Sequence, residues 1–415
     1  MAVENVRVAQ LERLRAGIGD LLKTNRFYRE RLHPVDTWED FERLPLTTKA
    51  EITADQQASP PFGTNLTFPI ERYTRLHQTS GTSGSSPLRW LDTPDSWDWW
   101  IRIWAEHVYR SAGVRADDRV FFAFSFGPFI GFWSAFGGAE RLGALLIPGG
   151  AMTTEQRLRA MLELRATVLC CTPTYAIRLA EAAQAAGLDL ASSDLRLTVH
   201  AGEPGASVPA TRDLIERSFG ARAFDHTGMT ELGPTGVSCT ARDGVHLIES
   251  EFVFEVRDDA GAVHGLPGSG TVTGELVATN LGRWGSPLIR YRTGDRVEVT
   301  RAPCACGSPF PKMLGGIRGR MDDMFTVRGF NLYPSQVEDL VRRHAAIGEF
   351  CIEVRQVRGV EEVTILCECQ DGSDGVVAGL ASDLRLALGA RITCRQVPVG
   401  ALPRSDLKSR RLIRV

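Results

Sequence analysis

A run of glycine and hydroxyl residues between positions 77 and 87 has the composition of a phosphate-binding loop. It reads HQTSGTSGSSP and follows a short β-like run, RYTRLHQ. Glycine lets backbone N–H groups approach an anion closely, and serine and threonine hydroxyls add donors, which is what a triphosphate requires. The loop is not a Walker A motif, because no Gly-Lys-Ser/Thr follows it. A solvated Ser/Gly turn is the alternative interpretation.

Two further turns place a carboxylate close to hydroxyl groups. Asp225 to Glu231 reads DHTGMTE, and its final hydroxyl and carboxylate could hold Mg²⁺ against phosphate oxygens. Tyr291 to Asp295 reads YRTGD, and a turn aspartate can bind the two hydroxyls of a ribose. Taken singly, each is also a common turn. Two more motifs complete the set of five. The fourth is GRMDD at 319–323 with VRGFNLYP at 327–334 and Glu338, and the fifth is LPRSDLK at 402–408.

Four soft or borderline metal ligands form two closely spaced pairs. Six residues separate Cys239 from His246, and one residue separates Cys304 from Cys306 in the turn-rich run APCACGSPFP. Two such pairs fit a closed tetrahedral Zn²⁺ site, which would be structural because all four positions are filled. Free thiols in a loop are the alternative. Most other cysteines lie in apolar runs and are predicted to be small core residues.

The bulk composition excludes several classes of protein. Hydrophobic residues make up 43% and charged residues 24% of the 415 residues, which is typical of a globular chain. Lys plus Arg (48) nearly balances Asp plus Glu (50), so bulk charge would not hold a nucleic acid. The N-terminal residues carry charges throughout and lack the apolar run of a secretory signal, so we expect a cytoplasmic protein.

Val120 to Ala139 is uncharged over twenty residues, the length of a membrane span. Pro128 and four glycines interrupt it. A buried strand from Arg119 to Phe126, a turn and a core helix fit this pattern better. We therefore expect no membrane partner.

The order of the predicted elements indicates the fold class. Up to about residue 320, strand-like runs alternate with helix-like runs, which predicts parallel α/β layers. From Leu247 to Val299, short strands with glycine turns predict an antiparallel β subdomain. We expect a large multi-layer α/β domain over residues 1–321 and a small α+β domain over residues 322–415.

In this order, the motifs resemble those of the adenylate-forming superfamily, which contains acyl-CoA synthetases, peptide-synthetase adenylation domains and luciferases. The phenylacetate–CoA ligase branch is the most similar, through NRFYRERL and LPLTTKAEI near the N-terminus, CTPTY at 171–175, AGEPG at 201–205 and the end LPRSDLK. The resemblance implies that a carboxylate attacks the α-phosphate of Mg-ATP, giving an acyl-adenylate and pyrophosphate. A thiol, usually that of coenzyme A, then displaces AMP.

The resemblance also implies roles for individual residues. Lys408 would bridge the α-phosphate and the carboxylate, Thr230 would contact the α-phosphate, and Glu231 would hold Mg²⁺. Asp322 would be the hinge of a mobile small domain, whose rotation brings Arg328-Gly329 to the pantetheine tunnel. The expected ATP-binding residues are Thr79, Ser80, Gly81, Thr82, Ser83 and Gly84 at the β- and γ-phosphates, Gly202, Glu203 and Pro204 at adenine, Asp295 and Arg320 at the ribose, and Asp225, His226 and Thr227.

Two departures from the family pattern are expected to weaken ATP binding. The family's phosphate loop usually ends Gly-Lys-Pro, whereas this chain has Gly84-Ser85-Ser86-Pro87 and lacks that cation. The family usually has an aromatic residue that stacks on adenine where this chain has Thr227. Neither change removes the chemistry at the α-phosphate.

Seven phenylalanines and Trp133 lie within residues 120–139, a region that borders the acid pocket in this branch. An aromatic-lined pocket suits a flat ring, so we expect a benzoate-, anthranilate- or phenylacetate-type acid rather than a fatty acid. Core packing is the alternative role for most of these rings. The expected pocket residues are Phe126, Phe132, Trp133 and Gly228.

Three functions stay open. The first is an aryl–CoA ligase, and the second is an adenylate-forming enzyme that passes the acyl group to a carrier protein, an amine or a hydroxyl. The third, a non-catalytic nucleotide-binding relative, is disfavoured by the retained Lys408, Thr230, Glu231 and Asp295. The expected partners are an aromatic carboxylic acid, ATP, Mg²⁺ and coenzyme A or a carrier protein, with structural zinc and without nucleic acid, and the chain is a monomer or a homodimer.

Overall fold

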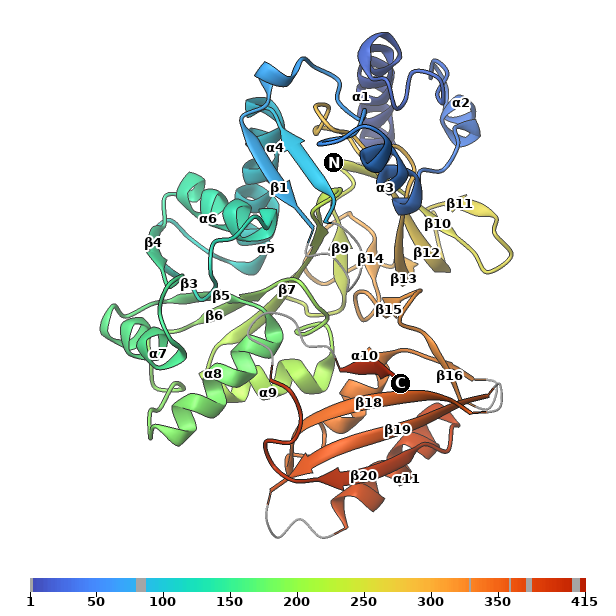
Figure 1. The fold of residues 1–415 in the computed structure, drawn as a ribbon. Coiled ribbons are helices and arrows are strands. Elements are labelled where there is room, and N and C mark those ends of the chain that lie inside the picture. The colour runs from blue at the N-terminus through green and yellow to red at the C-terminus, as the bar shows by residue number, and fades with distance from the viewer. Residues whose placement is uncertain (1–2, 80–86, 328–329, 358–359, 371–374, 405–410) are drawn as a thin grey trace.

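The β-sheets of the chain fall into two groups, separated by the connection that follows residue 320 (Figure 1). A computed structural model of the chain describes residues 3–79, 87–327, 330–357, 360–370, 375–404 and 411–415. A 13-stranded sheet and a two-stranded sheet precede the connection, and a two-stranded and a four-stranded sheet follow it. The connection runs from β15 (Gly319–Arg320) to β16 (Phe325–Val327), and the domain boundary expected at residues 321–322 lies within it.

Parallel strands form one half of the 13-stranded sheet. In spatial order they are β4 (Leu145–Pro148), β3 (Arg119–Phe122), β5 (Val168–Cys171), β6 (Leu197–His200) and β7 (Arg222–Met229). The helices that connect them in sequence are α6 (Ile130–Leu142), α7 (Thr154–Glu163), α8 (Pro173–Ala185) and α9 (Pro209–Phe219). The alternation of strand-like and helix-like runs thus predicted the fold class correctly.

The other half of the same sheet is antiparallel. Its strands, in spatial order from β7, are β8 (Gly233–Ser238), β9 (Val245–Leu247), β14 (Lys312–Met313), β13 (Tyr291–Thr300), β12 (Thr271–Asn280), β10 (Phe252–Arg257) and β11 (Val263–Gly265), with β15 paired to β13. These strands include the antiparallel run predicted from Leu247 to Val299. They continue the sheet of the parallel half, because β7 pairs in parallel with β6 on one edge and antiparallel with β8 on the other.

The uncharged stretch from Val120 to Ala139 forms a strand and a helix, as predicted. The strand ends at Phe122, earlier than the predicted Phe126. The reason is that Phe124 and Phe126 leave the sheet to pack on α6, where Phe124 stacks on Phe132 with ring centroids 4.2 Å apart. None of the helices among the described residues is both long and apolar enough to span a membrane.

The N-terminal segment packs against the antiparallel half of the sheet. Buried Glu251 joins the two, because its carboxylate accepts hydrogen bonds from Arg13 at 3.0 Å and from Trp99 at 2.7 Å. The segment's elements are α1 (Val3–Thr24), α2 (Trp38–Arg43), α3 (Lys49–Ala58), η1 (Ile70–Arg72), β1 (Arg75–Gln78), β2 (Arg89–Asp92), α4 (Pro94–Ile103), the π-helix η2 (Trp104–Tyr109) and α5 (Arg110–Ala112).

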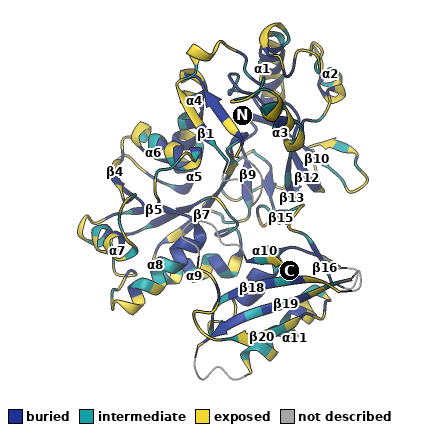
Figure 2. Cartoon of the chain, in the orientation of Figure 1, coloured by how far each residue is buried: buried dark blue, intermediate teal, exposed yellow. Residues whose placement is uncertain are grey.

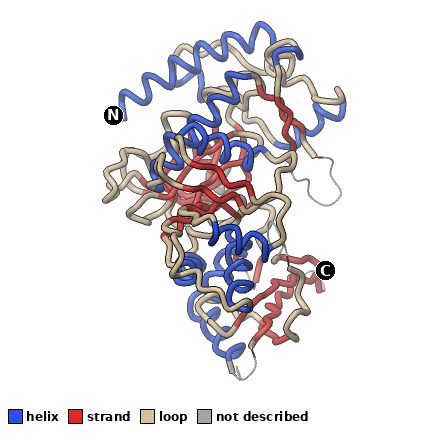
Figure 3. The backbone as a smooth tube through the Cα atoms, turned by 90° about the vertical axis from the view of Figure 1, so that its left-hand side faces the viewer, coloured by secondary structure: helices blue, strands red, loops and turns tan. Residues whose placement is uncertain are grey.

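The C-terminal part is a small α+β body with its own buried core (Figure 2). It lies below the large sheet in the view turned by 90° (Figure 3). Its sheet has the order β20-β19-β18-β21. Its elements after β16 are β17 (Phe330–Leu332), α10 (Pro334–Val341), β18 (Ile347–Val357), β19 (Val360–Cys369), α11 (Val376–Leu388), β20 (Thr393–Val397) and β21 (Leu412–Arg414).

Helix α10 of the small lobe lies against α9 of the large one. Asp339 of α10 accepts a hydrogen bond from the backbone N–H of Ala210 at 3.1 Å. Helix α9 has no side-chain cap from its own N-cap residue, Val208. The carboxylate of Asp339 therefore satisfies one of the free N–H groups at the start of that helix across the contact between the lobes.

Candidate functional site

The carboxyl ends of β5, β6 and β7 bring three predicted motifs to one edge of the sheet. Residues 171–175 follow β5, residues 201–205 follow β6, and Asp225 to Glu231 run along the end of β7 and the turn beyond it. Ligands of open α/β sheets bind in the crevice outside the carboxyl ends of the strands, where the strand order changes. The switch of β7 from parallel to antiparallel pairing places that crevice here.

The loop expected at adenine is fixed from both of its neighbouring strands. Glu203 accepts a hydrogen bond from the backbone of Thr174 at 2.9 Å. Both carboxylate oxygens of buried Asp225 accept backbone hydrogen bonds, from Ala206 at 2.8 Å and from Ser207 at 2.5 Å. Asp225, expected at ATP, thus acts on the loop that carries Gly202 and Pro204 instead of presenting a free carboxylate.

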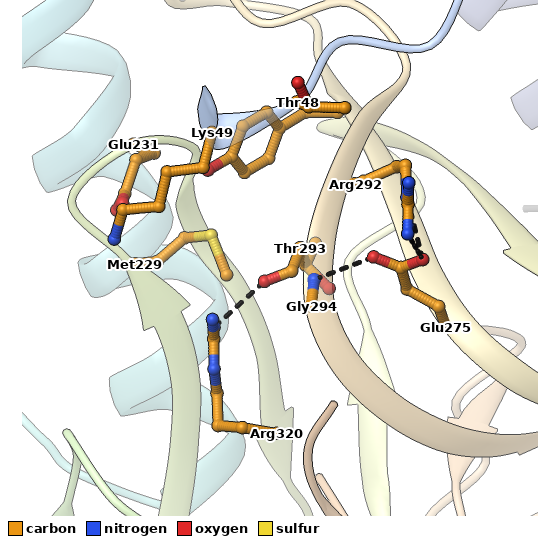
Figure 4. A pocket seen from close by; sticks show the side chains of 10 residues that line it. Thr48, Lys49, Met229, Glu231, Glu275, Arg292, Thr293, Gly294 and Arg320 are labelled. Atoms are coloured by element: carbon orange, nitrogen blue, oxygen red, sulfur yellow. Dashed lines mark hydrogen bonds and ion pairs between the residues drawn. The ribbon is translucent and has the colours of Figure 1, made fainter. Parts of the chain in front are cut away.

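A cleft of about 260 Å³ opens between β7 and β13 (Figure 4). Glu231, the expected Mg²⁺ ligand, is buried at its wall with 7% exposure. The ammonium group of Lys49 lies 3.6 Å from a carboxylate oxygen of Glu231. The residues that line the cleft are Thr48, Lys49, Met229, Glu231, Glu275, Tyr291, Arg292, Thr293, Gly294 and Arg320.

The two residues expected at the ribose lie side by side at this cleft. Strands β13 and β15 pair so that Asp295 is opposite Arg320, and the guanidinium Nη1 lies 3.4 Å from a carboxylate oxygen. The same nitrogen donates to the carbonyl of Thr293 at 2.9 Å. Gly294 has φ +75°, and a Cβ there would lie 2.9 Å from Arg320, so this turn requires glycine. Burial raises the pKa of Asp295 to about 6, although Arg320 lowers it.

A fully buried ion pair lies behind the turn that carries Thr230 and Glu231. Arg283 binds Asp92 through two hydrogen bonds of 2.7 and 2.8 Å. Its third nitrogen donates to the carbonyls of Thr230 at 2.6 Å and Glu231 at 3.0 Å. Burial alone would raise the pKa of Asp92, but Arg283 and His77 hold that pKa below its usual value. The pair fixes the backbone of the turn that carries Thr230 and Glu231.

The expected acid-pocket residues are only partly brought together. Phe126 and Phe132 pack on the core cluster that contains Trp104, Phe124 and Phe224. Trp133 lies at the outer edge of that cluster, 39% exposed, with its indole N–H donated to the carbonyl of Gly127. Gly228 lies on β7, with the imidazole of His226 against it.

The structure places three more of the expected site residues, Thr79, Thr227 and Asp322. Thr79 lies at the base of the phosphate loop, where its hydroxyl accepts a hydrogen bond from the backbone of Leu88 at 3.0 Å. Thr227 hydrogen-bonds Thr235 at 3.2 Å and presents no ring to adenine. Asp322 is exposed and accepts from Arg320 at 3.1 Å. The expected residues Ser80, Gly81, Thr82, Ser83, Gly84, Arg328, Gly329 and Lys408 lie outside the described residues.

The four predicted zinc ligands converge in a second site. The donor atoms of Cys239, His246, Cys304 and Cys306 all lie within 4.8 Å of one another. The imidazole Nδ1 of His246 lies 2.8 Å from the carbonyl of Phe310, which can only accept, so Nδ1 carries the proton. The other nitrogen, Nε2, is then free for a metal and lies 3.4 Å from the Cys306 sulfur.

Lys49 and the Asp92–Arg283 pair are site residues that the sequence motifs did not reveal. A signal for Lys49 exists, because Thr48 and Glu51 form a capping box that makes Lys49 the first residue of α3. That start lies at the cleft, and Lys49 brings a cation to a site whose phosphate loop lacks its usual lysine. Asp92 and Arg283 are 191 positions apart, and no local pattern pairs them.

The chain is similar to known proteins over its whole length. Residues 329–414 match the family of the AMP-binding enzyme C-terminal domain. Phenylacetate-coenzyme A ligase of Pseudomonas putida is 31% identical over 436 residues, covering 98% of this chain and 94% of that protein. Phenylacetate-coenzyme A ligase of Escherichia coli K12 is 29% identical, covering 99% and 95% of the two chains.

Solved structures of 2-hydroxyisobutyryl-CoA ligase are similar in fold. In its postadenylation state, in complex with R3-HIB-AMP, that ligase has a TM-score of 0.93 at 29% identity, covering 100% of this chain and 90% of that chain. In its thioesterification state, with 2-HIB-AMP and CoA, it has a TM-score of 0.74 with the same coverage. Because both structures are of the same ligase, the difference between the two TM-scores reflects the conformation of that ligase. The arrangement of the two lobes here resembles the postadenylation state.

We expect the Asp92–Arg283 pair to be needed as a unit. Asp92→Leu should lower the melting temperature more than the double change Asp92→Leu/Arg283→Met, because the single change leaves a buried guanidinium unpaired, at a cost of roughly 3–5 kcal/mol. Thermal unfolding of both variants tests this. The exposed pair Arg165–Asp194 is a matched control, and Asp194→Leu should leave the melting temperature nearly unchanged. A double variant less stable than Asp92→Leu would contradict the pairing.

Nucleotide binding should weaken as the pH falls through about 6, because Asp295 then takes up a proton and loses an acceptor for the ribose. The KM for ATP between pH 5 and 8 measures this. Asp295→Asn, which cannot titrate, should bind ATP more weakly and show no inflection near pH 6. The same inflection in both proteins would mean that another group is responsible.

Proposed function

The chain belongs to the phenylacetate–CoA ligase family of AMP-forming, adenylate-forming enzymes, and on that premise we propose that its substrate is an aromatic carboxylic acid of the benzoate, anthranilate or phenylacetate type. The products would be the aryl-CoA thioester, AMP and pyrophosphate. The observation that carries the proposal is the cleft in which Glu231, Arg320 and Lys49 meet beside Asp295. In this arrangement, Glu231 would hold a metal ion on the phosphates, Asp295 and Arg320 would bind the ribose, and Lys49 would neutralise phosphate charge.

In the first step, the enzyme would accelerate the reaction by positioning the reactants and stabilising the charge on the phosphate oxygens. The carboxylate oxygen of the acid attacks the α-phosphorus of ATP, and the bond to the pyrophosphate oxygen breaks. Glu231 would hold the Mg²⁺ of MgATP, which neutralises charge on the phosphate oxygens. Thr230 would contact the α-phosphate, and the buried Arg283 keeps the Thr230–Glu231 backbone in place for this. Lys408 would bridge both reactants during this step.

The second step requires a different arrangement of the lobes. The thiol of coenzyme A attacks the acyl carbon and AMP leaves, carrying the former carboxylate oxygen. The hydrogen bond between Asp339 and Ala210 joins the lobes in the arrangement described, so we propose that it opens when the small lobe rotates about Asp322. Arg328-Gly329 would then face the pantetheine arm.

We propose an aromatic acid because a cluster of aromatic side chains lies next to β7. Phe124 and Phe132 stack with centroids 4.2 Å apart, and Trp104 of the same cluster lies 4.4 Å from the imidazole of His226. Flat rings of this kind favour a flat substrate. The likeness to 2-hydroxyisobutyryl-CoA ligase favours a second candidate, a small aliphatic hydroxy acid. A carrier-protein thiol or an amine in place of coenzyme A is the other alternative for the acceptor.

We also propose that Cys239, His246, Cys304 and Cys306 hold a structural Zn²⁺. Two thiolates from one loop, a third from the end of β8 and an imidazole from β9 form a closed donor set. The proton on His246 Nδ1 is directed to a backbone carbonyl, as is usual for a metal-bound imidazole. The ion would tie the loop around Cys304 to the β8–β9 hairpin.

Purified protein should release pyrophosphate from ATP only when a suitable aromatic acid is present, and should form AMP and a thioester at a steady rate only when coenzyme A is added. A pyrophosphate-release screen of aryl acids, with 2-hydroxyisobutyrate included and with and without coenzyme A, tests this. Glu231→Gln is the matched control and should lower the rate with every acid. Release of ADP, or no acid dependence, would contradict the proposal. Turnover of 2-hydroxyisobutyrate alone would favour the second candidate.

Zinc should be present at one ion per chain in protein purified without chelators, as measured by elemental analysis. Cys304→Ser should lose the ion and lower thermal stability more than it lowers turnover per folded molecule, because metal binding contributes to folding. Cys394→Ser is the control, since Cys394 is half-buried away from the cluster and should keep the ion. Absence of any metal in the unaltered protein would refute the site.

A further inference from the structure

The imidazole of His226 presents a hydrogen-bond acceptor that no described residue uses. Its Nδ1 lies 3.0 Å from the carbonyl of Gly236. A carbonyl oxygen only accepts, so Nδ1 carries the proton and Nε2 has a free lone pair. Burial lowers the pKa of His226 to about 4, which keeps the ring neutral in this tautomer. Within the described residues, Nε2 has no hydrogen-bond partner.

The free nitrogen lies next to Gly228. Residues 226 and 228 lie two apart on β7, and alternate residues of a strand share a face. A Cβ built on Gly228 would lie 2.8 Å from the carbonyl oxygen of Gly233 on β8 and 3.1 Å from His226 Nε2, so the nitrogen lies directly beside this glycine. Gly228 is exposed, whereas His226 is only 8% exposed. Because residue 228 has no side chain, it leaves Nε2 uncovered on the exposed side of β7, from which a bound acid would approach it.

The indole of Trp104 forms the other wall of this position. Its ring lies 4.4 Å from the imidazole at an interplanar angle of 55°. Trp104 begins the π-helix η2, and such local widenings of a helix are frequent at functional sites. A Cβ at Gly138 of α6 would lie 2.4 Å from the Cβ of Trp104, so the close approach of α6 fixes the tryptophan. Its buried Nε1 also has no partner among the described residues.

The same strand leads directly to the reacting groups. Met229 and Glu231, which follow Gly228, line the cleft where the phosphates are proposed to bind. Two residues of strand span about 7 Å, which is close to the length of an aromatic ring with its carboxylate. An acid whose carboxylate lies at Thr230 therefore reaches back to Gly228, where its ring edge meets His226 Nε2, which lies 3.1 Å from the Cβ position of residue 228.

On the basis of the proposed function, we propose that His226 selects aromatic acids that carry a hydrogen-bond donor on the ring, a hydroxyl or an amino group. The donor would bind Nε2 in the narrow space between Gly228 and Trp104. An acid without it would cover the imidazole and leave a buried acceptor unpaired, which is costly. In this proposal, His226 contacts the acid. The family resemblance had instead assigned it to ATP binding.

The test compares kcat/KM for matched acids in the pyrophosphate-release assay with coenzyme A. Benzoates with hydroxyl, amino, methyl and methoxy groups at each ring position distinguish the effect of a hydrogen-bond donor from the effect of the substituent's size. At one ring position, kcat/KM for the hydroxybenzoate and the aminobenzoate should exceed kcat/KM for the methyl- and methoxybenzoates by roughly ten- to a hundredfold. No such preference in the unaltered enzyme would overturn the inference and leave the proposed aromatic function standing.

Two variants test whether His226 causes the preference for acids with a hydrogen-bond donor on the ring. In His226→Leu, the ratio of hydroxyl to methyl acid at that position should fall to about one, whatever happens to the absolute rates. His264→Leu is the control, because His264 is exposed and paired with Asp258, and it should keep the ratio of the unaltered enzyme. A preference that persists in His226→Leu would overturn the inference. If no aromatic acid is turned over but 2-hydroxyisobutyrate is, the aromatic function fails, and the inference with it.

Discussion

A fully buried ion pair, Asp92 with Arg283, joins the three segments from which the site is built. Asp92 ends β2 beyond the phosphate loop, Arg283 follows β12, and its third nitrogen binds the carbonyls of Thr230 and Glu231. The guanidinium lies between the rings of Trp90 and Trp100, so little water can compete for it. A charge in this position is stable only while all its partners stay in place, which makes the geometry of the turn a condition of folding.

The sheet supplies the second constraint. Because β7 pairs in parallel with β6 and antiparallel with β8, its end is the one point where the loops of the parallel half meet the strands of the antiparallel half. The loop that follows β6 lies on one side, where Asp225 accepts hydrogen bonds from the backbone of Ala206 and Ser207, and the Asp295–Arg320 pair lies on the other. Between them, β7 carries His226 and Gly228, which we propose to contact the acid, and the turn after it carries Thr230 and Glu231, which we propose to act at the phosphates. The proposed substrate recognition and phosphate chemistry thus lie on one strand and the turn that follows it.

Sequence reasoning predicted the α/β class, the family and the grouping of Cys239, His246, Cys304 and Cys306, because each depends on local patterns or on short spacings such as Cys304 to Cys306. Zinc at that cluster stays a prediction. It placed Asp295 and Arg320 together through the family resemblance, and the β13–β15 pairing brings them together. It did not find Lys49 or the Asp92–Arg283 pair, whose contacts form only after distant segments pack. It predicted the antiparallel strands from Leu247 to Val299 but not that they continue the parallel sheet, since the sequence of a strand does not show what pairs with its second edge.

The central claim is that the acid becomes an acyl-adenylate in the cleft beside Glu231 and Asp295. The most direct measurement uses an aromatic acid labelled with ¹⁸O in its carboxylate, turned over with ATP and coenzyme A, followed by mass spectrometry of the products. Attack on the α-phosphorus leaves one carboxylate oxygen on AMP when the thiol displaces it, so the account predicts one ¹⁸O atom in AMP and none in pyrophosphate. Label in orthophosphate with release of ADP, or AMP without label, would contradict it.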